Sequence, residues 1–286
     1  FLGIEVIAFA NTSGTSTATF SADQFGSGKI SSSVSVTGTA STNAIVVNVA
    51  AGGSFDMSSW TFATWSATDT VAINGSTGNE TITGSGKTDL IVGAAGADTL
   101  LGGAGLDVFG FNPGDTALSF GGAGTSGTVS GYDTVSDFTV GTTVSAAEKL
   151  GFIGANVGAD TASSAGAAST LLLHTGAAVQ SHSITGGLIT FDDAGAFAGA
   201  VTIDTAGDLA AVAEYLQGTD LGDAGTSVAF QAILGGVGRT FVWIQGNDAA
   251  GTSNVLVDLV NVSGSSLSAA SDLISVLDNA APNAPT

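Results

Sequence analysis

Residues 75–110 decide the fold of this chain, and they read Gly75-Ser-Thr-Gly-Asn-Glu-Thr-Ile-Thr83, Gly84-Ser-Gly-Lys-Thr-Asp-Leu-Ile-Val92, Gly93-Ala-Ala-Gly-Ala-Asp-Thr-Leu-Leu101 and Gly102-Gly-Ala-Gly-Leu-Asp-Val-Phe-Gly110. Each of the four units opens with glycine and has an acid sixth and a large apolar residue eighth. The acids are Glu80, Asp89, Asp98 and Asp107, and the apolar residues are Ile82, Ile91, Leu100 and Phe109. A glycine-rich linker that contained acids by chance would have no period, so the spacing predicts a repeating local structure.

The period predicts a coil with stacked acids. Early glycines allow a tight loop at the start of each unit, and the last residues form a short strand with its apolar side chain inward. Two units then make one turn of a coil, so loops two units apart share an edge. Glu80 should lie close to Asp98, and Asp89 close to Asp107. Stacked carboxylates repel unless a cation neutralises them, and calcium accepts irregular shells of carboxylate and carbonyl oxygen atoms.

The repeat resembles the nonapeptide of RTX proteins, Gly-Gly-x-Gly-x-Asp-x-apolar-x. This sequence departs from that pattern at Ser76, Glu80, Lys87 and Ala94. The resemblance implies a right-handed parallel β-roll with calcium between successive loops, and export by type I secretion. The implied calcium ligands are the first, third, fifth and sixth residues of each unit. They are Gly75, Thr77, Asn79, Glu80, Gly84, Gly86, Thr88, Asp89, Gly93, Ala95, Ala97, Asp98, Gly102, Ala104, Leu106 and Asp107.

Composition excludes several classes of function. The 286 residues include 24 acids and only 4 bases, for a net charge of −20. Such a chain repels nucleic acid, and it contains no apolar run long enough for direct membrane insertion. It has no cysteine, so no disulfide or thiolate chemistry is available. The first residues resemble a strand from the middle of a fold, and we expect them to follow a longer upstream segment or a processing site.

We expect an all-β fold, a parallel β-roll or β-helix followed by a β-rich carboxyl-terminal module with one short helix. The predicted regions are a β-helix or stacked β-coil (1–74), the calcium-binding β-roll (75–112), a flanking segment (113–154) and the carboxyl-terminal module with the secretion signal region (155–286). Strands are expected in the first region at 5–9, 17–20, 33–36, 44–49, 60–65 and 70–73. Trp60 and Trp65 are expected to cover the coil, with carbohydrate stacking as the alternative.

The segments after the roll carry weaker patterns. Asp133 and Asp137 either bind a further calcium ion or cap turns, and residues 121–131 suggest a mobile surface loop. A helix is predicted at 206–217, capped by Thr205, ended by Gly218 and packed on a sheet. Strands are predicted at 171–173, 188–191, 229–234, 240–244 and 255–259, then an apolar segment at 268–277 and a loose tail at 280–286. The order of elements from 204 to 262 is similar to the carboxyl-terminal module of RTX surface-layer proteins of the Caulobacter type and of related cyanobacterial surface proteins.

Catalytic patterns are missing from the sequence, and we expect no enzyme activity. His174 and His182 are eight residues apart, without a His-Glu-x-x-His motif, and no Gly-x-Ser-x-Gly motif occurs. Asp192 and Asp193 are adjacent on a predicted strand, so they should point in opposite directions and form a turn or a minor calcium site.

Together, the residues and the resemblance predict a structural, calcium-dependent, self-assembling protein of a bacterial surface layer (S-layer) or extracellular filament. It would be secreted to the exterior or cell surface of a Gram-negative-type bacterium. Its partners would be copies of itself, with cell-surface polysaccharide as a further candidate. Two alternatives are an RTX adhesin or carbohydrate-binding surface module that uses Trp60, Trp65 or Trp243, and the carboxyl-terminal secretion half of an exported hydrolase.

Overall fold

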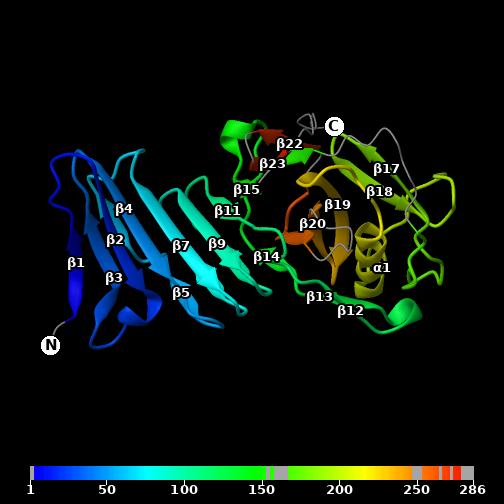
Figure 1. The fold of residues 1–286 in the computed structure, drawn as a ribbon, viewed down its shortest axis with the longest axis horizontal. Helices are drawn as coiled ribbons and strands as arrows, with labels where there is room; N and C mark the ends of the chain where they lie inside the picture. Colours follow the sequence, from blue (N-terminus) through cyan, green and yellow to red (C-terminus); the bar gives the residue numbers. More distant parts are fainter. Residues whose placement is uncertain are drawn as a thin grey trace, which may run out of the picture. The chain divides into compact units, whose positions relative to one another are not determined.

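The structure is a computed structural model that describes residues 3–152, 155–157, 167–246, 253–263, 266–270 and 273–277. The chain divides into two compact units, Phe1–Phe111 and Asn112–Thr286. Strands dominate both units, and the described residues contain a single α-helix (Figure 1). The predicted all-β class with parallel sheets and one short helix is therefore confirmed.

The first unit is a coil of parallel strands that form three faces. The first face contains β1 (Ile4–Ala8), β3 (Ile30–Thr37) and β6 (Thr61–Ala63). The second contains β2 (Thr15–Ser21), β4 (Thr42–Asn48), β7 (Thr70–Ser76), β9 (Asp89–Ala94) and β11 (Val108–Gly110), and the third contains β5 (Ser54–Asp56), β8 (Thr81–Thr83) and β10 (Thr99–Leu101). Figure 1 shows β4, β7 and β9 side by side along the coil. The predicted strands are present within a few residues, and β5 is the one that the sequence analysis missed.

The coil becomes shorter where the nonapeptide repeats begin. Val47 pairs with Ile73, which is 26 residues later, whereas Ile73 pairs with Ile91, only 18 residues later. The same 18-residue step joins Ile91 to Phe109. The face made by β1, β3 and β6 has no further strand after β6 within this unit, so two nine-residue repeats complete a turn of two strands and two loops. This is the two-unit coil that the period predicts.

Inward-pointing apolar side chains form the core of the first unit. Each strand alternates between inward and outward side chains, so stacked strands build columns of identical orientation. One column contains Val47, Ile73, Ile91 and Phe109, all fully buried. Phe55, Ile82 and Leu100 form the facing column. The residue at the eighth position of each repeat is therefore the core residue, as expected.

The second unit contains two sheets, a hairpin and the helix. One sheet has the order β17 (Ser181–Thr185), β18 (Leu188–Asp192), β19 (Thr226–Leu234), β20 (Val237–Ile244), β21 (Val255–Val260) and β14 (Asp133–Val135), and β16 (Asn156–Val157) pairs with β19. The other has the order β15 (Lys149–Gly151), β23 (Leu273–Leu277) and β22 (Ser266–Ala270), and β12 (Ser119–Gly121) pairs with β13 (Thr128–Ser130). The tail predicted at 280–286 lies outside the described residues.

The helix α1 (Ala206–Gln217) has the predicted bounds and cap. The Thr205 side chain accepts a hydrogen bond from the Asp208 backbone, and Gly218 ends the helix. The helix is buried more completely than an amphipathic stripe predicts, because Tyr215 and several alanines are buried beside the leucine and valine positions. It packs in one core with side chains of β18, β19 and β20, so the prediction that it packs on a sheet is confirmed.

Two local predictions were wrong. Residues 121–131 are not a mobile loop, because β13 lies there and the partly buried Val129 packs against the helix core. Glycine and serine content predicted flexibility, but contact with α1 orders the segment. Residues 171–173 form no strand and make only an isolated bridge between Leu172 and Ala178. Their apolar side chains instead fill the core from a turn, with Leu171 and Leu173 buried.

Candidate metal centre in the nonapeptide coil

The four acids of the repeats point into their own loops. Each precedes or begins a strand of the second or third face, which places the carboxylate where the loop closes. Glu80, Asp89, Asp98 and Asp107 are all at most 1% exposed. An ionised carboxylate that is taken out of water needs hydrogen bonds or a cation to be stable. The burial of four acids in succession therefore requires a compensating interaction in each loop.

Backbone amides of the same loop provide part of that compensation. The backbone N–H of Ser76 donates to Oε2 of Glu80 over 2.9 Å. In the next loop the backbone N–H of Ser85 donates to Asp89 Oδ2, and the Ser85 hydroxyl donates to Asp89 Oδ1 over 2.9 Å. The acid thus holds its loop closed, which is why the loop and the strand after it keep a fixed spacing.

Hydrogen bonds between coils stack the acids at the predicted interval. The backbone N–H of Glu80 donates to Asp98 Oδ1 over 2.7 Å, and that of Asp89 donates to Asp107 Oδ1 over 2.8 Å. Each pair is separated by 18 residues. The structure therefore brings together the two pairs of acids that the period predicts, on alternate edges of the coil.

Glycine at the first position of each unit lets oxygen atoms converge. A Cβ on Gly93 would lie 2.2 Å from Asp98 Oδ2, and one on Gly102 would lie 2.3 Å from Asp107 Oδ2. On Gly75 it would lie 2.2 Å from the carbonyl oxygen of Gly93. Any side chain here would displace a carboxylate or a carbonyl of the next loop. Because these residues are glycines, carboxylate and carbonyl oxygen atoms can line the space between successive loops, which we call the cradle. Oxygen is the donor that calcium prefers.

The pKa of Asp89 reflects its burial beside a second carboxylate. Burial raises the pKa of Asp89 to about 7, and the negative charge of Asp107 adds to this, whereas hydrogen bonds from Ser85 act in the opposite direction. A carboxylate at this depth beside a second carboxylate is unfavourable at neutral pH. The residues therefore fit a divalent cation, which would favour the ionised form of both acids.

One residue of the cradle comes from before the repeats and was missed by the sequence analysis. The backbone N–H of Gly52 donates to Oε1 of Glu80 over 2.6 Å, so the loop that precedes β5 closes the first site. Glutamate, one methylene longer than aspartate, reaches this amide. Glu80, which replaces the usual aspartate, thus lies where the 26-residue turns of the coil give way to the 18-residue turns.

Asp69 is a second residue that the period did not reveal. Its Oδ1 accepts hydrogen bonds from the backbone N–H of Asn43 over 2.7 Å and from Asn43 Nδ2 over 2.9 Å. Asn43 lies 26 residues earlier, one coil back, which is the relation that Glu80 has to Asp98. Here an amide replaces the partner carboxylate, so this pair needs no metal. It lies beside the column of repeat acids and outside it, because Val71 is the residue that pairs with Asp89.

Calcium binding by the other predicted ligands stays a prediction. Those at the first, third and fifth positions would act through backbone carbonyl oxygens of the same loops. In the second unit, Asp133 begins β14 and is fully buried, whereas Asp137 follows that strand and is half-buried.

Several other residues named by the sequence analysis have structural roles. Trp60 is 4% exposed and packs against Phe25 and Phe55, and Trp243 is fully buried. Trp65 is half-buried against Phe9 and Phe62. Asp192 accepts hydrogen bonds from the backbone N–H groups of Ala194, Ala198 and Gly199, and Asp193 is exposed. The adjacent acids therefore point in different directions, and Asp192 closes a turn.

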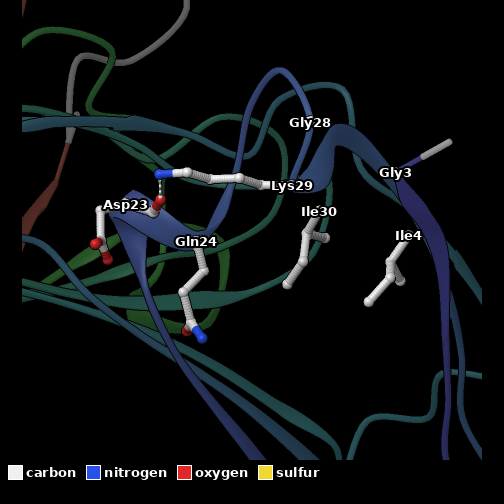
Figure 2. Close-up of a pocket in the computed structure, with 7 residues that line it drawn as sticks. All are labelled: Gly3, Ile4, Asp23, Gln24, Gly28, Lys29 and Ile30. Atoms are coloured by element: carbon white, nitrogen blue, oxygen red, sulfur yellow. Dashed lines mark hydrogen bonds between the residues drawn. The ribbon is translucent and has the colours of Figure 1, made fainter. Parts of the chain in front are cut away.

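A pocket of about 530 Å³ lies at the first coil (Figure 2). Gly3, Ile4, Asp23, Gln24, Gly28, Lys29 and Ile30 line it. Lys29 Nζ donates to the backbone carbonyl of Asp23, as the dashed line in Figure 2 marks. None of the seven lining residues is a histidine, serine, cysteine or tyrosine. Its charged side chains are Asp23 and Lys29.

The stacked strands and buried acids define a calcium-binding β-roll. Residues 74–109 match the family model of the RTX calcium-binding nonapeptide repeat, in four copies. Residues 74–109 are thus RTX-type nonapeptide repeats, and the cofactor of such repeats is calcium. No curated protein and no solved structure matches the chain. In the described part of the chain, no helix combines the length and the apolar character that crossing a membrane requires.

Proposed function

We propose that this protein is a secreted structural protein of a bacterial cell surface that calcium folds and that assembles with copies of itself. The observation that carries the proposal is the stack of four buried acids, Glu80, Asp89, Asp98 and Asp107. Calcium outside a cell is abundant enough to fill weak sites, whereas such a stack would be poorly neutralised without it. RTX repeats are typical of secreted proteins, which agrees with this location.

The outer surface of the coil supports assembly between copies. Ser54, Thr81 and Thr99 form a row of small polar side chains across β5, β8 and β10. Thr83 lies beside Asp56 in the next row. Short side chains on a regular sheet lose little conformational entropy on contact, so they suit broad contacts between flat surfaces. The net charge of −20 opposes such contacts, and we expect divalent cations to bridge them.

The non-catalytic part of the proposal is supported by the two histidines. His174 Nδ1 lies 3.0 Å from Asp208 Oδ2, and His182 Nδ1 lies 2.8 Å from the buried Tyr215 hydroxyl. These contacts hold each imidazole against a carboxylate or a phenol of the second unit. The adhesin alternative loses Trp60 and Trp243 as stacking platforms, because both are buried.

Light scattering of the full chain during a calcium titration tests the proposal. We expect particles much larger than the 27.6 kDa chain in calcium, and their dispersal by a chelator. The double variant Asp89→Asn/Asp107→Asn should assemble only at higher calcium concentration. Asp193→Asn removes one exposed charge outside the roll and is the control, with unchanged assembly. A calcium-saturated protein that is folded by circular dichroism yet stays monomeric at every concentration would contradict self-assembly.

A further inference from the structure

A second group of metal-ligating side chains lies in the unit that contains α1. His174 Nδ1 is 3.0 Å from Asp208 Oδ2, 3.1 Å from Asp208 Oδ1 and 3.3 Å from Asp204 Oδ1. The ligand atoms of the three residues all lie within 4.8 Å of one another. The three side chains come from two segments, the turn at 173–176 and the start of the helix. Their convergence is therefore a product of the tertiary fold.

The group is held in place before any ion arrives. The backbone N–H of His174 donates to Asp208 Oδ1 over 2.7 Å, which fixes the turn to the helix. Asp208 Oδ2 accepts hydrogen bonds from the Thr205 hydroxyl over 2.8 Å and from the backbone N–H of Thr205 over 3.0 Å. Asp208 is fully buried, so its carboxylate cannot rotate away from the imidazole. A site that needs no rearrangement binds its ligand at lower entropic cost.

We propose that His174, Asp204 and Asp208 bind a divalent transition-metal ion of the zinc class, separate from the calcium sites of the roll. The donor set decides the metal, because imidazole nitrogen suits zinc and its neighbours in the first transition row, whereas calcium takes oxygen. Ligand atoms about 2.1 Å from one ion are about 3.0 Å apart in octahedral and about 3.4 Å apart in tetrahedral geometry. The nitrogen–oxygen separations of 3.0 Å and 3.3 Å lie in this range.

Exposure and charge favour the arrival of an ion. The side chains of His174 and Asp204 are 45% and 46% exposed, so water can complete the coordination shell. The negative charges of Asp204 and Asp208 together exceed the positive charge of the helix N-terminus, which is roughly half an elementary charge. Among the ion pairs of the described residues, the one with an arginine or lysine is Arg239–Asp258, so neither Asp204 nor Asp208 is paired with such a side chain there. The competitor at Nδ1 is a proton, which hydrogen bonding to Asp208 favours by raising the pKa of His174.

The bound ion would fasten the turn at 173–176 to the start of α1. The turn is closed by the backbone bond from Gly176 N–H to the Leu173 carbonyl over 2.8 Å, and Leu173 is buried in the helix core. A metal bridge would add a link between this turn and the helix to the existing hydrogen bonds. We therefore expect zinc to raise the melting temperature of the calcium-saturated protein.

Zinc titration by calorimetry, with the full chain in saturating calcium at about pH 8, above the ordinary pKa of imidazole, tests the proposal. We expect one zinc ion per chain, and His174→Gln and Asp204→Asn should each weaken binding at least tenfold. Asp193→Asn, which removes the same charge from an exposed acid outside the group, should bind zinc as the wild type does. Asp208 stays unchanged because it caps the helix.

Cobalt provides a spectroscopic check on the ligands. Cobalt added to the calcium-saturated wild type should give visible absorption bands that His174→Gln loses and Asp193→Asn keeps. Equal zinc binding by the wild type and His174→Gln would overturn the proposal and leave a hydrogen-bonded histidine as the role of this group. That result would not affect the calcium-dependent assembly, which rests on other residues and is measured without zinc.

Discussion

Asp69 precedes β7, whereas Asp89 begins β9 on the same face, and the pKa values of the two acids shift in opposite directions. Burial acts to raise both. Hydrogen bonds from Ser66 and from Asn43 outweigh burial at Asp69 and lower its pKa, whereas the neighbouring charge of Asp107 adds to burial at Asp89. The hydrogen bonds from Asn43 and Ser66 thus stabilise the charge of Asp69. Deeper burial, with the neighbouring carboxylate of Asp107 as a smaller cause, makes the charge of Asp89 unfavourable without a cation.

The calcium-free protein should lose stability as pH rises from about 4 to about 7. The folded state keeps a proton on Asp89 up to about pH 7, whereas the unfolded chain releases it near pH 4, so unfolding releases a proton in this window. The free energy of unfolding therefore falls with pH, by a few kcal/mol at most. Urea denaturation in chelator at pH 5 and pH 8 measures this. Asp89→Asn should flatten the dependence, and a wild type more stable at pH 8 would contradict the explanation.

Gly93→Ala should weaken calcium binding strongly, whereas Gly199→Ala, outside the roll, should change it little. A Cβ at Gly93 would lie 2.2 Å from Asp98 Oδ2, and a Cβ at Gly199 meets nothing within 4 Å. Both glycines have ordinary φ angles, so the comparison isolates the collision from backbone strain. Calcium titration followed by circular dichroism measures the midpoint for each variant. Equal midpoints would show that the cradle does not bind calcium at this loop.

Asn43→Asp should convert the metal-free pair into one that needs a cation. The change removes the Nδ2 donor to Asp69 and puts a second carboxylate beside it, at a cost on the order of 1–3 kcal/mol. We expect a lower melting temperature in chelator and partial recovery in calcium. Asn48→Asp, at an exposed position, is the control and should change neither value much.

At the scale of elements, the shortening of the coil from 26 to 18 residues depends on the loops. In the first unit the longer turns contain three strands, and their loops are closed by direct hydrogen bonds such as those at Asp69. The nonapeptide turns contain two short strands, each with a single inward core residue, so little apolar surface holds them together. Their loops must therefore contribute more of the stability, which is where calcium acts.

Removal of calcium should therefore unfold the repeats before the helix. We expect backbone amides of β8, β9, β10 and β11 to lose protection in hydrogen exchange when a chelator is added, whereas α1, buried in its own core, stays protected. Mass spectrometry of peptides from residues 75–110 and 206–217 measures the two regions in one sample. Unchanged protection of 75–110 would mean that calcium is not needed for this part of the fold.

The elements of the second unit show how far local patterns predict structure. Helix α1 was predicted to the residue, because Thr205, Asp208 and Gly218 mark its ends and local hydrogen bonds decide them. The segment 121–131 was misjudged because glycine, serine and threonine dominate its composition. Val129 and α1 order it through contacts between segments distant in sequence, which no local pattern reveals.

At the scale of the whole molecule, charge is the dominant property. A net charge of −20 in 286 residues opposes compaction, and calcium would neutralise part of it. The calcium-free chain should have a larger hydrodynamic radius in low salt than in about 0.15 M sodium chloride, which screens charges beyond roughly 8 Å. Calcium at millimolar concentration should reduce the radius further than an equal ionic strength of sodium chloride. Dynamic light scattering below the assembly concentration measures this, and an equal effect of both salts would exclude specific binding.

The sequence alone determined most strand-forming segments of the first unit, the nine-residue period, the two-unit coil and the pairing of Glu80 with Asp98 and of Asp89 with Asp107. These features follow from the constant length of the repeats. Because every unit has nine residues, residues 18 apart in the sequence lie beside each other in space. Only the tertiary structure decided that Gly52 completes the first loop, that Asn43 replaces a carboxylate beside Asp69, and that His174 meets Asp204 and Asp208. Those contacts join residues from turns of different length or from separate segments, where no repeating distance along the chain predicts proximity in space.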